Sequence, residues 1–160
     1  MDYSLRALVG KPAVLASAIE EHLPFTRASG ADPSHTQIVP LGLGLSLIPL
    51  SNTLLQELQG GEEAATSVPG FLMLSSSLMR WVMRASESGA IAYVEAEFYD
   101  VVRSQSASVW DRGQIALGPL HEKDAISRAL AHLGVSAVDP FAAVGLGRFK
   151  STEEWLSLSR

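Results

Sequence analysis

The sequence predicts an α+β protein, in which a mostly antiparallel sheet carries helices on one of its faces. Two observations lead to this class. Segments with strand-like alternation gather in clusters, and segments with helical periodicity lie between those clusters. The composition agrees, because 47% of the 160 residues are hydrophobic and only 18% are charged, which is enough apolar surface to fill a core. We expect one domain that spans residues 1–160.

The first half of the chain predicts strands at two places and three helices. Residues 4–9 form a short apolar run typical of a strand, and a helix is expected to begin at Pro12, since the first turn of a helix does not need the N–H that proline lacks. The stretch QIVPLGLGLSLIPL, residues 37–50, predicts one bent strand or two short ones, and its glycines indicate a bulge or a close approach of backbones. Further helices are expected over residues 51–60 and 74–85.

The second half predicts three strands followed by two helices. A strand is expected over residues 92–99, and residues 104–110 and 114–117 flank the Asp-Arg-Gly stretch of an expected hairpin. Apolar residues recur at helical spacing over residues 125–133. A Ser-x-x-Glu capping box that starts at residue 151 predicts a short final helix. We expect the three tryptophans of the chain to lie in the core.

The composition also bears on which classes of function are open. The net charge is −5 and there is no run of Lys or Arg residues, so the acidic chain lacks the basic patch of a general nucleic-acid binder. The absence of cysteine excludes disulfides, thiolate zinc sites, iron–sulfur clusters and a cysteine nucleophile. We see no signal peptide and no apolar run of about 18 residues, and therefore expect a cytoplasmic protein without a membrane span. The sequence contains no complete catalytic or metal-binding motif. We therefore expect no cofactor, and we favour a protein that is not an enzyme.

The most suggestive surface is the stretch AYVEAEFYD. Alternate residues of a strand share a face, so Tyr93, Glu95, Glu97 and Tyr99 line one side and apolar residues line the other. The two glutamates would lie roughly 7 Å apart. A plain solvent-facing surface, a partner-binding face and a catalytic or metal-binding pair all fit this pattern. The tyrosines favour partner binding, because tyrosine is enriched at interfaces. We therefore take these four residues, extended by Asp100, as the candidate partner-binding surface.

A second candidate lies near the C-terminus. Arg148 and Lys150 come just before the expected final helix, where they are candidate contacts for an anion, although a basic loop packed before that helix fits as well.

No two histidines have the spacing that binds zinc on a helix; the four are His22, His35, His121 and His132. The sequence therefore predicts no metal site.

Much of the chain resembles a known group of proteins. The segments AYVEAEFYD, SQSASVW, RGQIALGP, ALAHLGV and DPFAAVGLGRFKSTEEW, with VPLGLGLSLIP at residues 39–49, are similar to small uncharacterised bacterial proteins that are common in actinobacteria. The resemblance covers most of the chain beyond residue 38. The group typically has a glycine-rich turn, roughly Phe-Gly-Gly-x-Gly, after the glutamate strand. Residues 99–103 contain no glycine, which implies an altered function if that turn approaches a ligand. Small acidic bacterial proteins of this type resemble immunity proteins of toxin systems.

These observations lead to two expected functions. The first is a non-enzymatic immunity protein that occludes a bacterial toxin, a basic protein partner, with its acidic and aromatic sheet face. The second is a small-ligand-binding protein or an enzyme of unknown class that uses Glu95 and Glu97, helped by Arg148 or a loop histidine. A homo-oligomer paired through the same face is less favoured, because facing rows of glutamates repel. The sequence leaves the oligomeric state open.

Overall fold

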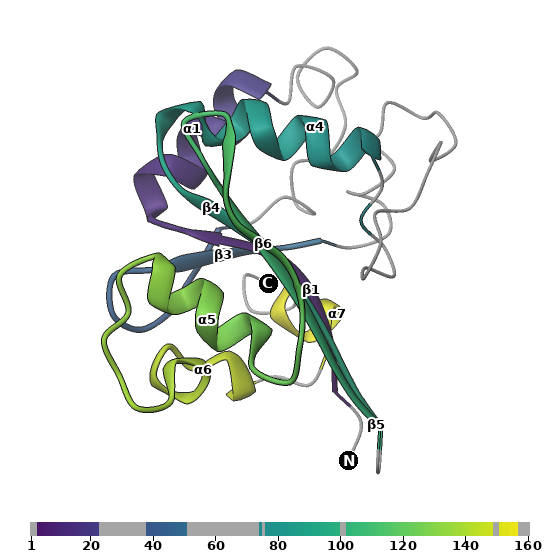
Figure 1. Cartoon of the computed structure of the whole chain (residues 1–160). Coiled ribbons are helices and arrows are strands. Elements are labelled where there is room, and N and C mark those ends of the chain that lie inside the picture. The colour runs from purple at the N-terminus through teal and green to yellow at the C-terminus, as the bar shows by residue number, and fades with distance from the viewer. Residues whose placement is uncertain are drawn as a thin grey trace.

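The structure of the chain is a computed structural model that describes residues 3–22, 38–50, 74, 76–99, 102–148 and 151–156. The helix expected over residues 51–60, together with His35, Asp100 and Lys150, lies outside the described residues. The described residues build a six-stranded antiparallel sheet with helices packed on it (Figure 1). The α+β class and the antiparallel sheet are therefore confirmed.

The strands lie in the order β2-β3-β1-β4-β5-β6, and every pairing between them is antiparallel. Their bounds are β1 (Tyr3–Gly10), β2 (Val39–Pro40), β3 (Ser46–Pro49), β4 (Ile91–Tyr99), β5 (Val102–Asp111) and β6 (Gln114–His121). The helices are α1 (Pro12–His22), α4 (Ser76–Ala85), α5 (Ala125–His132), α6 (Pro140–Ala143) and α7 (Thr152–Leu156), with the short 3-10 helices η2 (Ser86–Ser88) and η3 (Leu146–Arg148).

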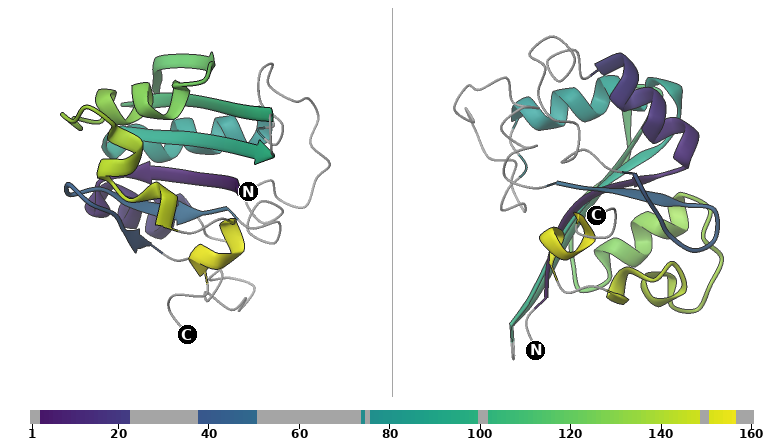
Figure 2. Two further views of the ribbon diagram at one scale, coloured as in Figure 1. Left: turned by 90° about the horizontal axis from the view of Figure 1, so that it is seen from below. Right: turned by 180° about the vertical axis from the view of Figure 1, so that it is seen from behind.

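Helices cover both faces of this sheet. In Figures 1 and 2, α1 and α4 lie on one face, which we call the upper face, and α5 and α6 lie on the lower face. The expectation of helices on one face only is therefore wrong. The reason is that β1 and β4 bury apolar side chains on both sides. Leu8 and Ile91 are buried in the upper core, whereas Val9 and Val94 are buried in the lower core.

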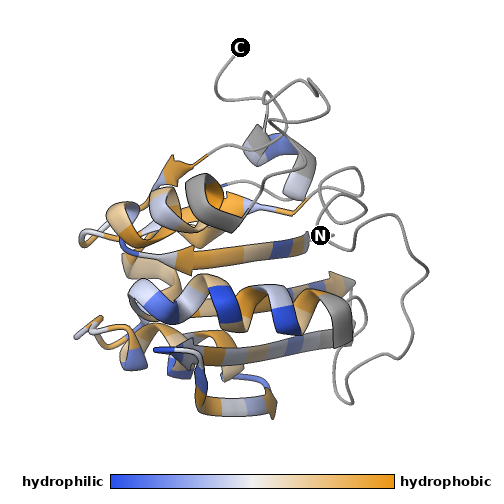
Figure 3. Cartoon of the chain, turned by 90° about the horizontal axis from the view of Figure 1, so that it is seen from above, coloured by the Kyte–Doolittle hydropathy of each residue, from blue (hydrophilic) through white to orange (hydrophobic). Residues whose placement is uncertain are grey.

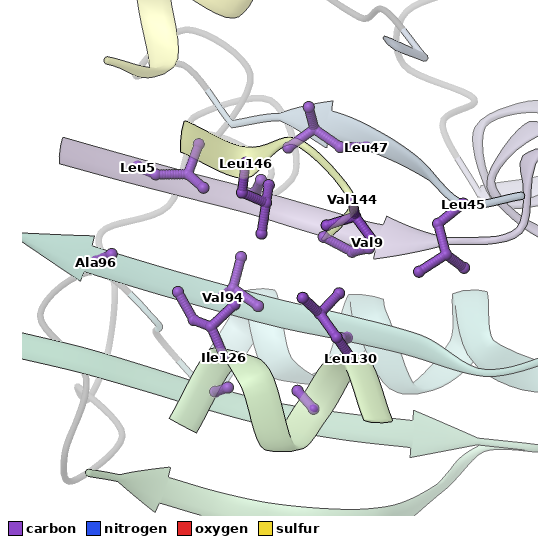
Figure 4. Close-up of a cluster of buried hydrophobic side chains, with 14 of the residues drawn as sticks. Leu5, Val9, Leu45, Leu47, Val94, Ala96, Ile126, Leu130, Val144 and Leu146 are labelled. Carbon is purple, nitrogen blue, oxygen red and sulfur yellow. The ribbon is translucent and has the colours of Figure 1, made fainter. Parts of the chain in front are cut away.

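The lower core holds α5 against the sheet. Ile126 and Leu130 of α5 are fully buried in one cluster with Val94 of β4 (Figure 4). A side chain of β5 also fixes the start of this helix, because Gln105 Oε1 accepts a hydrogen bond from the backbone N–H of Ile126 at 3.0 Å. That bond satisfies one of the N–H groups that the first turn of any helix leaves without an intrahelical partner.

The C-terminal elements are bound to β1. The Tyr3 hydroxyl donates to the carbonyl oxygen of Leu146 at 2.8 Å, which connects η3 to the first residue of the strand. The backbone N–H of Arg6 donates to Thr152 Oγ1 at 3.0 Å, at the first residue of α7. Segments from the two ends of the sequence therefore hold each other in place.

The upper core packs α1 and α4 on β1, β4 and β5. The apolar stripe predicted for residues 74–85 is buried as expected, while the outward side of α4 carries hydrophilic residues (Figure 3). All three tryptophans are buried, Trp81 and Trp110 in the upper core and Trp155 in the lower core. Their expected core positions are confirmed.

The stretch over residues 37–50 forms two short strands, β2 and β3, which is one of its two expected forms. The expected close approach of backbones occurs at Gly42, whose N–H donates to the carbonyl oxygen of Val144 at 2.9 Å. A Cβ atom on Gly42 would lie 2.8 Å from the carbonyl oxygen of Ala143, so only glycine fits without a shift of the backbone.

The edge strand β6 is longer and less regular than expected. It continues through Pro119 to His121, and its pairing with β5 changes register twice, on either side of Val109. Such shifts mark bulges, which bend and twist a strand locally. The opposite edge strand, β2, has two residues, of which Pro40 is one.

The expected hairpin between β5 and β6 is confirmed, and η2 fixes its turn. Arg112 and Gly113 have φ values of 54° and 79°, the positive values that a two-residue hairpin turn requires. The carbonyl oxygen of Ser86 accepts the N–H of Arg112 at 2.8 Å, and its Oγ accepts the N–H of Gly113 at 3.1 Å. Ser86 Oγ also donates to the carbonyl oxygen of Met83 at 2.8 Å, so this buried hydroxyl connects the turn to α4.

Replacing Ser86 by alanine should lower the free energy of unfolding by about 1–3 kcal/mol, because the N–H of Gly113 loses its partner. Urea denaturation at equilibrium measures the loss. The matched control is Ser88→Ala, on the same 3-10 helix but exposed, which should change the free energy of unfolding by less than about 0.5 kcal/mol. Equal effects of the two substitutions would show that Ser86 does not anchor the turn.

Candidate functional site

The strand β4 places the predicted row of tyrosines and glutamates on the upper face of the sheet. Tyr93, Glu95 and Glu97 each have one register partner on β1 and one on β5. The partners are Leu8 and Ser108 for Tyr93, Arg6 and Ser106 for Glu95, and Ser4 and Ser104 for Glu97. The upper face therefore changes along β4, from largely apolar beside Tyr93 to polar from Glu95 onward.

Two residues of the predicted partner surface are buried. The exposed fraction is 0% for Tyr93 and 5% for Glu95. Tyr93 belongs to the upper core under α1 and α4. The sequence did not predict a helical layer on this face. The expectation of a solvent-facing row is therefore wrong for these two residues. Glu97 is half-buried, and the side chain of Tyr99 and all of Asp100 lie outside what the structure describes.

A row of polar side chains crosses the sheet beside Tyr93. We call Arg6, Glu95, Ser106 and His121 the polar row, because the register aligns them across β1, β4, β5 and β6. The Tyr93 hydroxyl donates to Glu95 Oε1 at 2.6 Å. Ser106 Oγ and His121 Nδ1 lie 2.7 Å apart and share a hydrogen bond whose direction depends on the tautomer of the imidazole. Four strands thus contribute to one polar band.

Burial governs the protonation of Tyr93. It raises the pKa of Tyr93 well above the ordinary value of 10.0, the nearby carboxyl group of Glu95 raises it further, and Arg6 lowers it. The phenol therefore stays protonated at neutral pH and remains a hydrogen-bond donor to Glu95. This bond lowers the cost of placing a carboxyl group in the interior, since buried polar groups are stable only when they are hydrogen-bonded.

The polar row combines groups that take part in proton transfer. A hydroxyl within hydrogen-bond reach of an imidazole is the first element of a nucleophile–base pair. The order along the row does not match a catalytic triad, however, because Ser106 lies between Glu95 and His121, whereas a triad places the histidine between the acid and the serine. The geometry therefore describes a hydrogen-bonded polar band with an exposed histidine at its outer end.

The predicted anion contact lies on another part of the molecule. Arg148 is exposed at the end of η3, and Leu146 of the same element is buried in the lower core. Glu95 belongs to the upper face, so the expected site that combined Glu95 with help from Arg148 is wrong. Because Lys150 lies outside the described residues, anion binding by Arg148 and Lys150 stays a prediction.

Sequence reasoning missed two members of the polar row, Arg6 and Ser106, and it named His121 only as one of four histidines. They are far apart in the sequence, and only the register of four strands aligns them. A partial signal was present in β5, where serines alternate at residues 104, 106 and 108. That alternation indicates a polar side of the strand, although it does not say which strands lie beside it.

Comparisons of this chain with protein-family models, with curated proteins and with solved structures find no match. Among the helices that the structure describes, none is long and apolar enough to cross a membrane. Over the same residues, no group of three or more His, Asp or Glu side chains is placed to hold a metal ion. The candidate site is therefore defined by the geometry of this chain alone.

The raised pKa of Tyr93 predicts a loss of stability in alkali. Above about pH 10 the unfolded chain releases the tyrosine proton and the folded chain retains it, so the free energy of unfolding falls by up to about 1.4 kcal/mol per pH unit. Tyr93→Phe should therefore show a shallower fall than the unaltered protein in urea denaturation above this pH.

Tyr3 provides a comparison, because burial raises its pKa as well. Tyr3→Phe should reduce the alkaline slope in the same direction, and the double substitution should reduce it most. If Tyr93→Phe follows the same pH profile as the unaltered protein, the burial of Tyr93 is contradicted.

Proposed function

We propose that this chain is a non-enzymatic protein-binding protein and, in the most specific form of the proposal, an immunity protein that neutralises a basic bacterial toxin by occluding it. The observation that carries the proposal is the environment of Glu97. Its partly exposed carboxyl group makes no hydrogen bond and no ion pair within the described ranges. Its register partners, Ser4 and Ser104, are neutral. The carboxylate is therefore available to a cationic group of a partner.

The position of Glu97 supports contact with a large molecule. It lies near the end of β4 that pairs with the start of β1, and there the strands β1, β4 and β5 continue beyond α4 and α5 (Figures 1 and 2). A sheet end that extends past the helices reaches a partner surface more easily than a residue beneath a helix. The contact surface proposed here is thus the outer part of the predicted row, starting at Glu97.

The electrostatics of the chain favour a basic partner. The net charge of −5 attracts a cationic protein over a distance of about a Debye length, and a carboxylate at the contact orients it. The hydrogen bond between the side chains of Tyr93 and Glu95 lies beside Glu97 in the same row of β4. The toxin-neutralising role itself is suggested by the resemblance to small acidic immunity proteins, and occlusion is the mechanism that such a surface supports.

The proposal is tested by co-purification of the tagged protein from its native host or together with the product of the neighbouring gene. We expect a stoichiometric protein partner whose binding weakens with salt. Glu97→Lys should lower the affinity at least about tenfold, because a lysine would face the partner's positive charge. Glu97 is the informative position, since reversal at buried Glu95 would also unfold the sheet.

The matched control is Asp124→Lys, which makes the same change of charge on an exposed residue at the start of α5 on the lower face. It should leave the affinity unchanged within about twofold. If Glu97→Lys binds as well as the unaltered protein, the proposed surface is wrong. If no protein partner co-purifies, the protein-binding function itself is wrong.

A second candidate function is binding or conversion of a small ligand at the polar row. It is favoured by the guanidinium of Arg6, which is partly exposed and makes no hydrogen bond or ion pair with any described residue, next to Glu95. A panel of metabolites and metal ions screened by thermal shift tests it. A compound that raises the Tm of the unaltered protein but not that of His121→Gln would place the ligand at this row. A panel without any such compound would count against this function.

A further inference from the structure

A pocket lies at the opposite end of the sheet from Glu97. Its volume is about 470 Å³. Its lining comes from the connection between β1 and α1, the connection between η2 and β4, the β5–β6 turn and the end of α5. Leu45, the residue before β3, completes the lining. Five separate parts of the chain thus converge on one concave site, and none of its lining residues belongs to the polar row.

The pocket has apolar walls and charges of both signs. Its apolar lining is supplied by Val14, Leu45, Ala90 and Leu133. The ionisable lining residues are Lys11, Glu87, Asp111, Arg112 and His132. In the part of the chain that the structure describes, none of these five side chains makes an ion pair or a hydrogen bond with another residue. Positive and negative groups therefore surround the same space without neutralising each other by direct contact.

The walls of the pocket are held in place without a ligand. Arg112 occupies the positive-φ position of the β5–β6 turn, and its backbone N–H is bound to Ser86 at 2.8 Å. Lys11 lies between the last residue of β1 and the first residue of α1. His132 is the last residue of α5, a helix that is anchored in the lower core. A site that is already formed loses little entropy when it binds a ligand.

We propose that this pocket binds a zwitterionic small molecule with an apolar body, the chemistry shared by apolar amino acids and by short peptides with free termini. Its volume lies within the range of about 300–1,000 Å³ that is usual for small-molecule sites. Lys11 and Arg112 attract the carboxylate, Glu87 and Asp111 attract the ammonium group, and the apolar lining receives the side chain.

Ligands with one sign of charge suit this pocket less well. An anion meets the carboxylates of Glu87 and Asp111, and a cation meets Lys11 and Arg112, so each would gain attraction on one side and repulsion on the other. A neutral apolar ligand would leave all of these charges partly desolvated and unpaired. Only a ligand that carries both charges pairs with both groups of side chains.

This site is independent of the proposed protein-binding function, because the pocket and Glu97 lie at opposite ends of β4. The probe is the dipeptide Leu-Leu, added to isotope-labelled protein and followed by two-dimensional NMR of the backbone amides. We expect shifts of the pocket residues Gly89, Ala90 and Arg112 that saturate with concentration. The blocked peptide N-acetyl-Leu-Leu-amide, which lacks both terminal charges, should bind at least about tenfold more weakly.

Two variants test the two charged sides of the pocket. Arg112→Gln and Glu87→Gln should each weaken Leu-Leu binding by about tenfold. Both residues are exposed, so both variants should fold, which the NMR spectrum itself reports. The matched control is Arg128→Gln, which removes an exposed positive charge from α5 outside the pocket and should bind Leu-Leu like the unaltered protein.

Free leucine as a second probe distinguishes the two members of the ligand class. Tighter binding of leucine than of Leu-Leu identifies an amino-acid site, and the reverse order identifies a peptide site. The proposal is overturned if neither probe shifts the pocket resonances, or if the blocked peptide binds as tightly as Leu-Leu. It is equally overturned if both charge variants bind like the unaltered protein.

Discussion

The structure depends on the need to cover both faces of β1 and β4. These central strands carry apolar side chains on each side, and an apolar strand surface left in water would lose the free energy of burial that folding gains. One helical layer on each side of the sheet meets this requirement. The upper layer, α1 and α4, determines which polar residues of these strands are buried. A side chain on the upper face of β4 lies in the interior unless it is near the end of the strand.

The polar row follows from this arrangement. Once the upper face is covered, Glu95 and Ser106 are kept in the interior, where their polar atoms must be hydrogen-bonded. Tyr93 and His121 supply such bonds from the neighbouring positions of the sheet. The same strands end in two different surfaces. One is the sheet end that carries the partly exposed side chain of Glu97, and the other is the pocket with charges of both signs. The length of β4 separates these two surfaces.

Much of the fold could be predicted from the sequence because local signals determine it. The β5–β6 turn needs residues that accept positive φ, α4 has one apolar stripe, and Ser151 caps the last helix through the N–H of Glu154 at 3.2 Å. The placement of α1 and α4 could not be predicted, since an apolar stripe shows that a helix is packed but not on which face of a sheet.

The candidate site was harder to predict than the fold. In a strand pattern Tyr93 and Glu95 look polar, yet the phenol ring is largely apolar and its hydroxyl provides the bond that a buried carboxyl group needs. The contributions of Gln105 and Ser86 were equally hidden, because each binds the backbone of residues that are about twenty or more positions away. Long-range hydrogen bonds of single polar residues leave no periodic pattern in a sequence.

The irregular edge strand β6 has a consequence for how this protein behaves when concentrated. A straight, regular edge offers unpaired N–H and C=O groups to any other extended chain, and this is a common route to aggregation and amyloid. Here the two changes of register twist β6, and Pro119 lacks the N–H that another residue would offer at this edge. At the opposite edge, the two residues of β2 and its Pro40 give little to pair with. The sheet is therefore protected against growth by strand addition at both edges, although neither edge strand carries a Lys, Asp or Glu to repel one.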